Sequence, residues 1–408
     1  MHFNAYFQHF ATQNVKNINK HVILNSIQFT PGGISRAGLA RQLGLTRSAI
    51  TTIVSDLMET GAIQESAKKT GTSGRPRTLL EITPEAGYVA GIDMGATHLR
   101  VVVSNFGAQV IREKEIAFDI AQDPEICLEK TDRLLQELLE EANLTLPQLS
   151  SIGVGVPGPV SADAGMVIAP PIMPGWDRFP IRKTLEKLWG LPISVNNDAE
   201  LGALGEWAYG AGRNAKDLAY IKVGHGIGAG LLINGQIYRG STGSAGEIGH
   251  LTIDEKGPIC TCGNRGCLEA LSGGGAIALQ AKNAVKEKKN TQLREISTKN
   301  ISAKDVAFAA QRGDFLAQQI MEEAGEHLGV ALAGLINIFN PDMIIVGGGV
   351  AQMGDILLEP IRKTVKERSL LSATTNVRIT TALLGRRSSS MGAVAQALSI
   401  AIHMIAEK

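Results

Sequence analysis

The chain of 408 residues has few cysteines, few aromatic residues and almost no net charge. Three of its four cysteines lie between positions 260 and 267, which does not suit a disulfide framework and is typical of a metal site in a reducing compartment. No apolar run reaches the roughly 18 residues that a membrane-spanning helix needs, and the first residues lack the charged and then apolar order of a signal peptide. We therefore expect a cytoplasmic protein with no membrane partner.

The charge is distributed unevenly along the chain, although its sum is only +1. Residues 1–82 contain nine lysines and arginines against four acidic residues, so the remainder of the chain is net acidic. A basic N-terminal module on a mildly acidic body indicates that the first part contacts a polyanion. The length allows two to four domains.

The N-terminal module has the pattern of three helices. Apolar residues recur at helical spacing over 15–27. Ser35 is placed to cap a short second helix that ends at Gly44, and Thr46 is placed to cap a third helix over Arg47–Thr60. Two short helices around a turn that contains glycine are typical of a helix-turn-helix, whose second helix enters a DNA major groove.

After the third helix, Ala62–Ile82 is expected to form two strands around a basic loop, which is the layout of a wing. Arginines in such a loop suit the narrow minor groove of DNA. The alternative is a small three-helix domain with a solvated basic loop. The candidate DNA contacts are Arg36, Thr46, Arg47, Ser48, Thr51, Arg75 and Arg77.

A cluster of metal-ligand residue types lies in the second half of the chain. His250, Cys260, Cys262 and Cys267 fall within 18 residues and are interleaved with glycines, which fits a tetrahedral structural zinc site with one ion per chain. Two nearby carboxylates, Glu247 and Glu269, are not needed as zinc ligands. They are free to contact another group.

Three glycine turns follow buried strands. The turns span Asp93–Thr97, Gly224–Gly230 and Gly347–Gly349. Glycine turns of this kind offer backbone amides to phosphate, although an ordinary tight turn explains each of them alone about as well. Their recurrence after three strands predicts a two-lobed, nucleotide-binding architecture.

Another strand is expected to end at Asn197-Asp198-Ala199-Glu200, directly before a helix. An acid in this place can accept a proton from a substrate hydroxyl. The alternative is an ordinary helix cap made by Asn197 or Asp198.

Together these motifs resemble the ROK family, which groups sugar kinases with sugar-responsive repressors, and the match extends over nearly the whole chain. Its most specific parts are VGHGIGAGLLINGQIYRGSTGSAGEIGH at 223–250 and CTCGNRGCLE at 260–269. DMGATHLR, VPGPV, PGW, NDAE and IIVGGG follow the order of the family. A winged helix followed by GRPR is typical of its repressors and is lacking in its kinases. The stretch GIDMGATHLRVVV is most similar to the xylose-responsive branch.

The resemblance implies an α/β chain with a winged helix-turn-helix over 1–82, followed by a two-lobed, actin-like (ribonuclease-H-like) sugar-kinase fold. It places the first lobe at 83–197, completed by a helix over 388–408, and the second lobe, with the zinc site, at 198–387. The sugar contacts that it implies are Gly158, Asn197, Asp198, Glu247, His250 and Glu269. The phosphate-loop residues that it implies are Asp93, Gly95, Thr97, Gly226, Gly228 and Gly348.

Three residues depart from the pattern of the family's kinases. Ala96 replaces a glycine, His98 a lysine and His225 a threonine. Bulk in these loops crowds amides meant for phosphate, so we expect ATP and Mg²⁺ binding to be lost or vestigial and Asp198 to be a vestigial kinase base.

These features lead to three hypotheses. The leading one is a repressor of carbohydrate-utilisation genes, responsive to a monosaccharide such as xylose or glucose, that binds operator DNA as a homodimer or homotetramer. The alternative is an ATP-dependent, glucokinase-like sugar kinase that carries a DNA-binding domain. The third is a repressor regulated by a partner protein instead of a free sugar.

Overall fold

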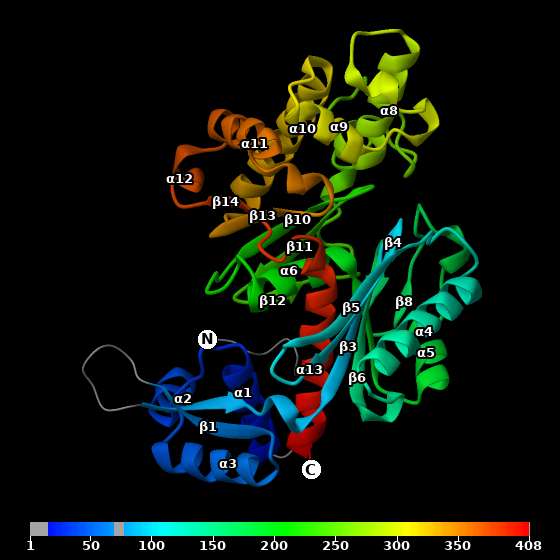
Figure 1. Ribbon diagram of the computed structural model, residues 1–408. Coiled ribbons are helices and arrows are strands. Elements are labelled where there is room, and N and C mark those ends of the chain that lie inside the picture. The colour runs from blue at the N-terminus through cyan, green and yellow to red at the C-terminus, as the bar shows by residue number, and fades with distance from the viewer. Residues whose placement is uncertain (1–14, 69–76, 408) are drawn as a thin grey trace.

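Three bodies of structure follow one another along the chain (Figure 1). The computed structural model describes residues 15–68 and 77–407. A small helical body at the N-terminus is followed by two lobes, each built on a five-stranded sheet. Within the described residues, the architecture is the mixed α/β fold with a winged helix that the sequence predicts.

The N-terminal body is a winged helix-turn-helix. Ser35 Oγ accepts a hydrogen bond from Gly38 N at 3.1 Å, and Thr46 Oγ1 accepts one from Ala49 N at 3.3 Å, so both predicted N-caps are confirmed. Gly44 ends the second helix with a left-handed φ of 68°. The elements are α1 (Val15–Gln28), α2 (Arg36–Leu43), α3 (Arg47–Glu59) and the antiparallel strands β1 (Ile63–Lys68) and β2 (Arg77–Ile82).

The first lobe is built on a sheet with the strand order β5-β4-β3-β6-β9. Strand β4 runs antiparallel to its neighbours β5 and β3, whereas β6 and β9 run parallel to β3. Its strands are β3 (Tyr88–Met94), β4 (His98–Asn105), β5 (Val110–Ala117), β6 (Leu149–Val156) and β9 (Ile193–Asn197), with a small hairpin of β7 (Val160–Ser161) and β8 (Met166–Val167). Helices α4 (Pro124–Glu141) and α5 (Ile181–Trp189) bury their apolar residues against one face.

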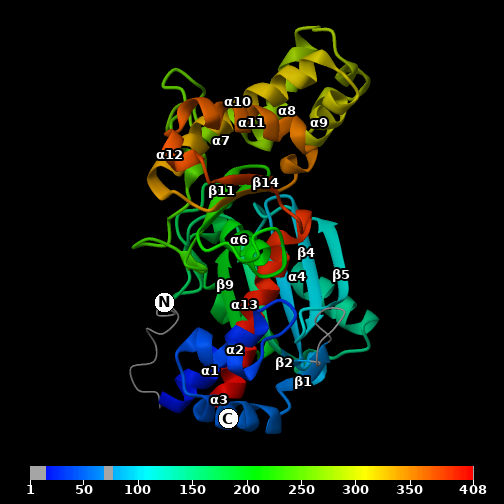
Figure 2. The ribbon, with the colours of Figure 1, turned by 90° about the vertical axis from the view of Figure 1, so that its left-hand side faces the viewer.

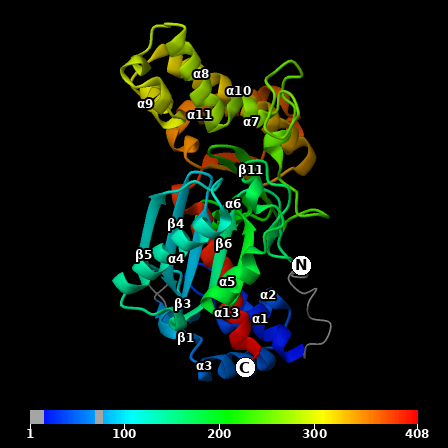
Figure 3. The same cartoon turned by 90° about the vertical axis from the view of Figure 1, so that its right-hand side faces the viewer.

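The second lobe repeats this sheet with the order β12-β11-β10-β13-β14 and the same strand directions. A group of helices covers its outer face (Figure 3). The strands are β10 (Leu218–Val223), β11 (Ile227–Ile233), β12 (Gln236–Tyr238), β13 (Met343–Gly347) and β14 (Arg378–Thr381). The helices are α7 (Leu268–Ser272), α8 (Gly274–Lys286), α9 (Ala303–Gln311), α10 (Phe315–Phe339), α11 (Asp355–Arg368) and α12 (Leu371–Thr374).

Two helices lie between the sheets and pack on each other. They are α6 (Asp198–Tyr209), on the inner face of the second sheet, and α13 (Ser388–Glu407), on the inner face of the first. A side chain at Gly205 would overlap the backbone of Ser388, and one at Gly392 would overlap that of Leu201. Small residues at the crossing therefore let the two backbones come into direct contact, which joins the lobes.

Helix α13 also packs against the winged helix. Its second half shares one apolar core with α1, α3 and strand β2, through residues such as Leu398 and Ile402 (Figure 2). By length and composition 385–405 could cross a membrane, in contrast to our expectation from apolar runs. However, 72% of the apolar window is buried inside the protein, which identifies a core helix.

The glycine turn expected at Gly224–Gly230 is shorter than predicted, because β11 begins at Ile227. Gly228 and Gly230 lie within this strand and pair with β10. A side chain at Gly230 would overlap the backbone carbonyl of Ala199 in α6. These glycines let the helix approach the sheet, and only Gly224–Gly226 form the turn.

Candidate functional site

A cavity of about 890 Å³ lies between the two lobes. The first lobe contributes the turn after β3 and the Pro157–Pro159 turn, and the second contributes the turn after β10 and the loop that precedes Leu251. Of the predicted residues, it brings together Asp93, Thr97, Gly158, Asn197, Asp198, Gly226, Gly228, Glu247, His250, Glu269 and Gly348. Predicted residues from seven separate segments of the chain therefore line one space.

The turn after β3 is closed by a histidine. Gly95 N donates a hydrogen bond to His98 O at 2.9 Å, and the His98 ring lies where a side chain at Gly95 would be. His98 Nε2 is 3.1 Å from Asp93 Oδ2. The imidazole thus covers the glycine of this turn and engages the acid that precedes it.

A lysine from the second lobe lies between the two acids of the cleft. Lys222 Nζ is 2.8 Å from Asp198 Oδ2 and 3.8 Å from Asp93 Oδ1. Burial favours neutral Lys222, but Asp198 and Asp93 outweigh it and raise the pKa of the ammonium, which stays charged. Burial also raises the pKa of Asp93, but Lys222 and His98 outweigh it, so that the pKa of Asp93 is lowered. Burial raises the pKa of Asp198 against the attraction of Lys222, and the charge of Asp93 adds to the increase. The two acids therefore share one internal cation.

Asn197 is the N-cap of α6, as the alternative interpretation of its motif held. Its Oδ1 accepts hydrogen bonds from Ala199 N at 2.8 Å and Glu200 N at 3.1 Å, while its Nδ2 donates to Gly158 O at 2.9 Å. The cap fixes the Pro157–Pro159 turn against the helix. Asp198 follows at the first position of α6, with its carboxylate directed at Lys222 and the cavity.

The two carboxylates that flank the metal motif reach the cleft from different elements. Glu269 Oε2 accepts a hydrogen bond from Ile227 N at 2.8 Å, which anchors it beside Gly226. Glu247 Oε2 lies 3.9 Å from His250 Nε2. Burial raises the pKa of Glu247, and the charges of Asp198 and Glu269 add to the increase.

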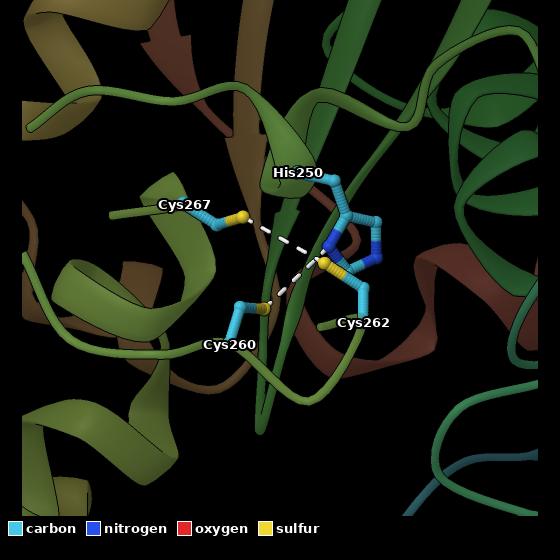
Figure 4. Close-up of side chains that lie close together, drawn as sticks. All are labelled: His250, Cys260, Cys262 and Cys267. Carbon is cyan, nitrogen blue, oxygen red and sulfur yellow. Dashed lines mark hydrogen bonds between the residues drawn. The ribbon is translucent and has the colours of Figure 1, made fainter. Parts of the chain in front are cut away.

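The four metal-motif side chains converge on one point (Figure 4). Their donor atoms lie within 4.8 Å of one another, with His250 Nδ1 3.7 Å from Cys260 Sγ and Cys262 Sγ 3.7 Å from Cys267 Sγ. In a tetrahedral zinc site with Zn–S bonds of about 2.3 Å, the ligands are about 3.8 Å apart. The donor set and its spacing therefore fit zinc, and the Nε2 edge of His250 remains on the side of Glu247.

Comparison with known proteins identifies the body of the chain. Residues 89–400 match the ROK family. The chain belongs to the ROK family. It is 32% identical, over 94% of its length and 96% of the relative, to a putative xylose repressor of Caldicellulosiruptor sp..

Two further similarities bear on this ROK protein. A solved ROK family transcriptional regulator, described as a homologue of the Escherichia coli Mlc protein, has a TM-score of 0.81 and 27% identity and covers 97% of this chain and 100% of its own. A glucokinase of Halalkalibacterium halodurans is 34% identical over 75% of this chain and 93% of its own length. The family thus includes both repressors and kinases among the relatives of this chain.

The N-terminal candidate residues of this ROK protein fall into three groups. Thr46, Arg47, Ser48 and Thr51 are exposed at the start of α3. Arg36 pairs with Glu65 on the wing, at 2.9 Å, and donates to Thr51 O. Arg75 lies outside the described residues, and Arg77 begins strand β2.

Two polar residues that contact Asp198 in the cleft were given no role from the sequence. Lys222 could have been found, since it is the one charged residue in the otherwise apolar strand Leu218–Val223. Ser389, which donates to Asp198 O at 2.8 Å and lies 3.3 Å from Lys222 Nζ, comes from the last helix and carries no local signal.

Proposed function

We propose that this ROK protein is a sugar-responsive transcriptional repressor. The observation that carries the proposal is that one continuous apolar core joins the winged helix to helix α13. The other end of α13 lies in the cleft between the lobes. The similarity to a putative xylose repressor extends over both parts of the chain. We assign the DNA-binding domain to 1–82, the first lobe to 83–197 with 388–408, and the second lobe to 198–387.

The winged helix binds operator DNA through α3. Its exposed N-terminal residues Thr46, Arg47, Ser48 and Thr51 contact bases and phosphates, and Arg75 and Arg77 of the wing reach the minor groove. Arg36, tied to Glu65, orients the wing on the helices. A two-fold homodimer, or a homotetramer made from two such dimers, would place two α3 helices on successive half-sites in the cytoplasm.

The cleft binds a monosaccharide, with xylose the first candidate and glucose the second. Glu247, Glu269 and Asp198 accept hydrogen bonds from sugar hydroxyls, and His250 adds direction through Nε2. Gly158 and Asn197 shape the wall next to α6. Burial raises the pKa of Glu247, and the charges of Asp198 and Glu269 from the same cavity add to the increase. Sugar hydroxyls at fixed spacing match such a group of carboxylates.

Zinc would be held by His250, Cys260, Cys262 and Cys267, and its contribution is structural. A closed Cys3His set has no open ligand position. The ion would fix the loop that carries His250 and the start of α7 that carries Glu269, so that both face the same sugar.

The sugar acts by changing which arrangement of the lobes is populated. A ligand shifts such an equilibrium only by its different affinity for the two states. Helix α13 contacts the cleft through Ser389 and the winged helix through Leu398 and Ile402. Closure of the cleft around the sugar therefore moves the winged helices relative to each other and releases DNA.

A glucokinase-like activity is the second candidate, favoured by the similarity to a glucokinase and by Asp198 at the cleft. Lys222 argues against it, because its ammonium engages both Asp198 and Asp93 in place of a metal–nucleotide complex. His98 also covers Gly95 of the turn where phosphate would bind. We therefore assign no phosphoryl transfer and no ATP or Mg²⁺ to this cleft, and regard Asp198 as a vestigial base.

The repressor function can be tested with full-length protein. We would select binding sequences from random duplex DNA and measure fluorescence anisotropy with xylose, glucose or N-acetylglucosamine. One sugar is expected to weaken DNA binding.

Arg47→Ala should weaken DNA binding about tenfold and leave the sugar-induced thermal shift unchanged. The matched control is Arg294→Ala, which replaces an exposed arginine of the second lobe and should change neither DNA binding nor the thermal shift. Enrichment of no DNA sequence would refute DNA binding, and indifference to every sugar would indicate regulation by a partner protein.

The kinase alternative is tested by ADP release from Mg²⁺-ATP with each sugar. Wild-type protein and Asp198→Asn are expected to give the same background rate. Turnover by the wild type above that of the variant would establish the kinase activity.

A further inference from the structure

A second group of metal-ligand side chains lies where the winged helix meets α13. His21 of α1 and His403 and Glu407 of α13 place one donor atom each within 4.8 Å of one another. The two imidazole rings are 3.8 Å apart between centroids and tilted by 34°. This cluster lies at the opposite end of α13 from the cleft.

The ligand spacing suits chelation by two helices. His403 and Glu407 are four residues apart and so lie on one face of α13, with Nε2 and Oε1 3.3 Å apart. Ligand atoms on an ion with bonds of about 2.1 Å are about 3.4 Å apart in tetrahedral geometry. His21 of α1, only 3% exposed, supplies the third ligand. It precedes His403 by more than 380 positions in the sequence.

The buried setting of the two rings favours the neutral imidazole, which is the form that binds metals. Burial, and then the charge of His403, lowers the pKa of His21 to about 4. Burial also lowers the pKa of His403, against the opposing charge of Glu407. A neutral imidazole offers a nitrogen lone pair to a cation.

We propose that His21, His403 and Glu407 bind a divalent transition-metal ion of the Zn²⁺ class that links the winged helix to α13. Two imidazoles and one carboxylate form a borderline donor set, which suits Zn²⁺, Co²⁺ or Ni²⁺ better than Mg²⁺ or Ca²⁺. With three protein ligands, water completes the coordination, so the ion exchanges more readily than one in the Cys3His cluster.

The site follows from the geometry alone and does not rest on the proposed function. Its consequence does: an ion here holds α1 on the end of α13, whose other end contacts Asp198 through Ser389. Occupancy of the site would make the connection between cleft and winged helix more rigid.

The test is a cobalt titration of the full-length chain after removal of bound metal with a chelator. Co²⁺ in the Cys3His cluster gives strong thiolate charge-transfer absorption, whereas Co²⁺ on nitrogen and oxygen ligands gives only weak visible bands. The wild type is expected to bind about two equivalents, and the second should appear without thiolate bands.

Two variants separate the new site from the first. Glu407→Gln keeps both rings in place and removes the anionic ligand, and His403→Gln removes one imidazole. Both are expected to bind about one equivalent, with the thiolate bands intact, and to lose the Zn²⁺-dependent rise in melting temperature at the second equivalent. The matched control is His327→Gln in α10, next to Ser272, which should still bind two equivalents of Co²⁺.

The possible results are decisive. Wild-type binding of only one equivalent, with thiolate bands, would overturn the proposal. So would two equivalents in both Glu407→Gln and His403→Gln. One equivalent without thiolate bands, lost in these variants, would support this site and contradict the proposed Cys3His zinc site.

Discussion

The two lobes have sheets of the same topology but carry opposite charges at equivalent positions of those sheets. Asp93, one residue before the end of β3, pairs with Gly155 of the parallel neighbour β6. Lys222, one residue before the end of β10, pairs with Gly347 of the parallel neighbour β13. The equivalent positions thus hold an acid in the first lobe and a base in the second, and the two side chains meet across the cleft at 3.8 Å.

The turns that follow these positions also differ. In the first lobe His98 fills the space beside Gly95, whereas in the second Glu269 fills the space beside Gly226. The first turn is therefore closed by its own strand, whereas the second is bordered by Glu269, two residues after Cys267. One sheet topology therefore supports a turn closed by His98 in one lobe and, under the function proposed above, a ligand-facing turn in the other.

The largest expected effect is on the second lobe, to which we assign the zinc site. Cys260→Ser removes one of four zinc ligands and should lower the unfolding free energy of the second lobe by about 4 kcal/mol or more, since zinc affinity is folding energy. Zinc content and thermal unfolding would measure the loss.

Cys127→Ser is the matched control in the first lobe. Cys127 is fully buried against Asp119 O and contacts no other cysteine, so its replacement should cost about 1 kcal/mol and leave zinc content unchanged. Equal destabilisation by the two variants would contradict a metal-dependent second lobe.

The next effect concerns the charges that meet across the cleft. Lys222→Met leaves two buried carboxylates without their cation and should lower the unfolding free energy by about 3 kcal/mol at pH 7. In the variant, burial and repulsion raise both carboxyl pKa values above their unfolded values near 4. Groups with raised folded pKa values stabilise the protein at low pH and lose that stabilisation as the pH rises, so the deficit should shrink from pH 7 to pH 4.

Urea denaturation at pH 7, 6, 5 and 4 would check this slope. Lys187→Met, an exposed lysine on α5, should show no such deficit. A deficit for Lys222→Met that stays constant with pH would show that Lys222 acts through packing and not through charge.

The smallest effect distinguishes the two turns. Gly226→Ala should cost about 1–3 kcal/mol, because its methyl group would displace Glu269 from Ile227 N. Gly95→Ala should cost less than about 1 kcal/mol, since His98 can swing toward solvent. Chemical denaturation would give both values, and a larger loss for Gly95→Ala would reverse the assignment of the closed and the ligand-facing turn.

The winged helix could be predicted almost element by element. Its helices α2 and α3 begin at the N-caps Ser35 and Thr46, and α2 ends at Gly44. Such caps act within a few residues of their own position. The Cys3His convergence was also predictable, since its ligands are close in sequence and the donor types are distinctive.

Other features depended on contacts between distant segments. Gly228 and Gly230 were expected in a turn but lie in a strand, because in a sequence a glycine that admits a neighbouring helix looks the same as one that bends the chain. Lys222 received no role, since its partners Asp93 and Asp198 lie on other elements.

The sequence by itself determined the order of elements, the family and the donor set of the metal cluster, because these follow from local periodicity, caps and motifs. Only the tertiary structure decided that Lys222 neutralises two acids, that Arg36 is bound to the wing and that His21 meets His403 at the end of α13. Charge pairing and ligand geometry depend on distances between residues that folding brings together, and no local pattern encodes those distances.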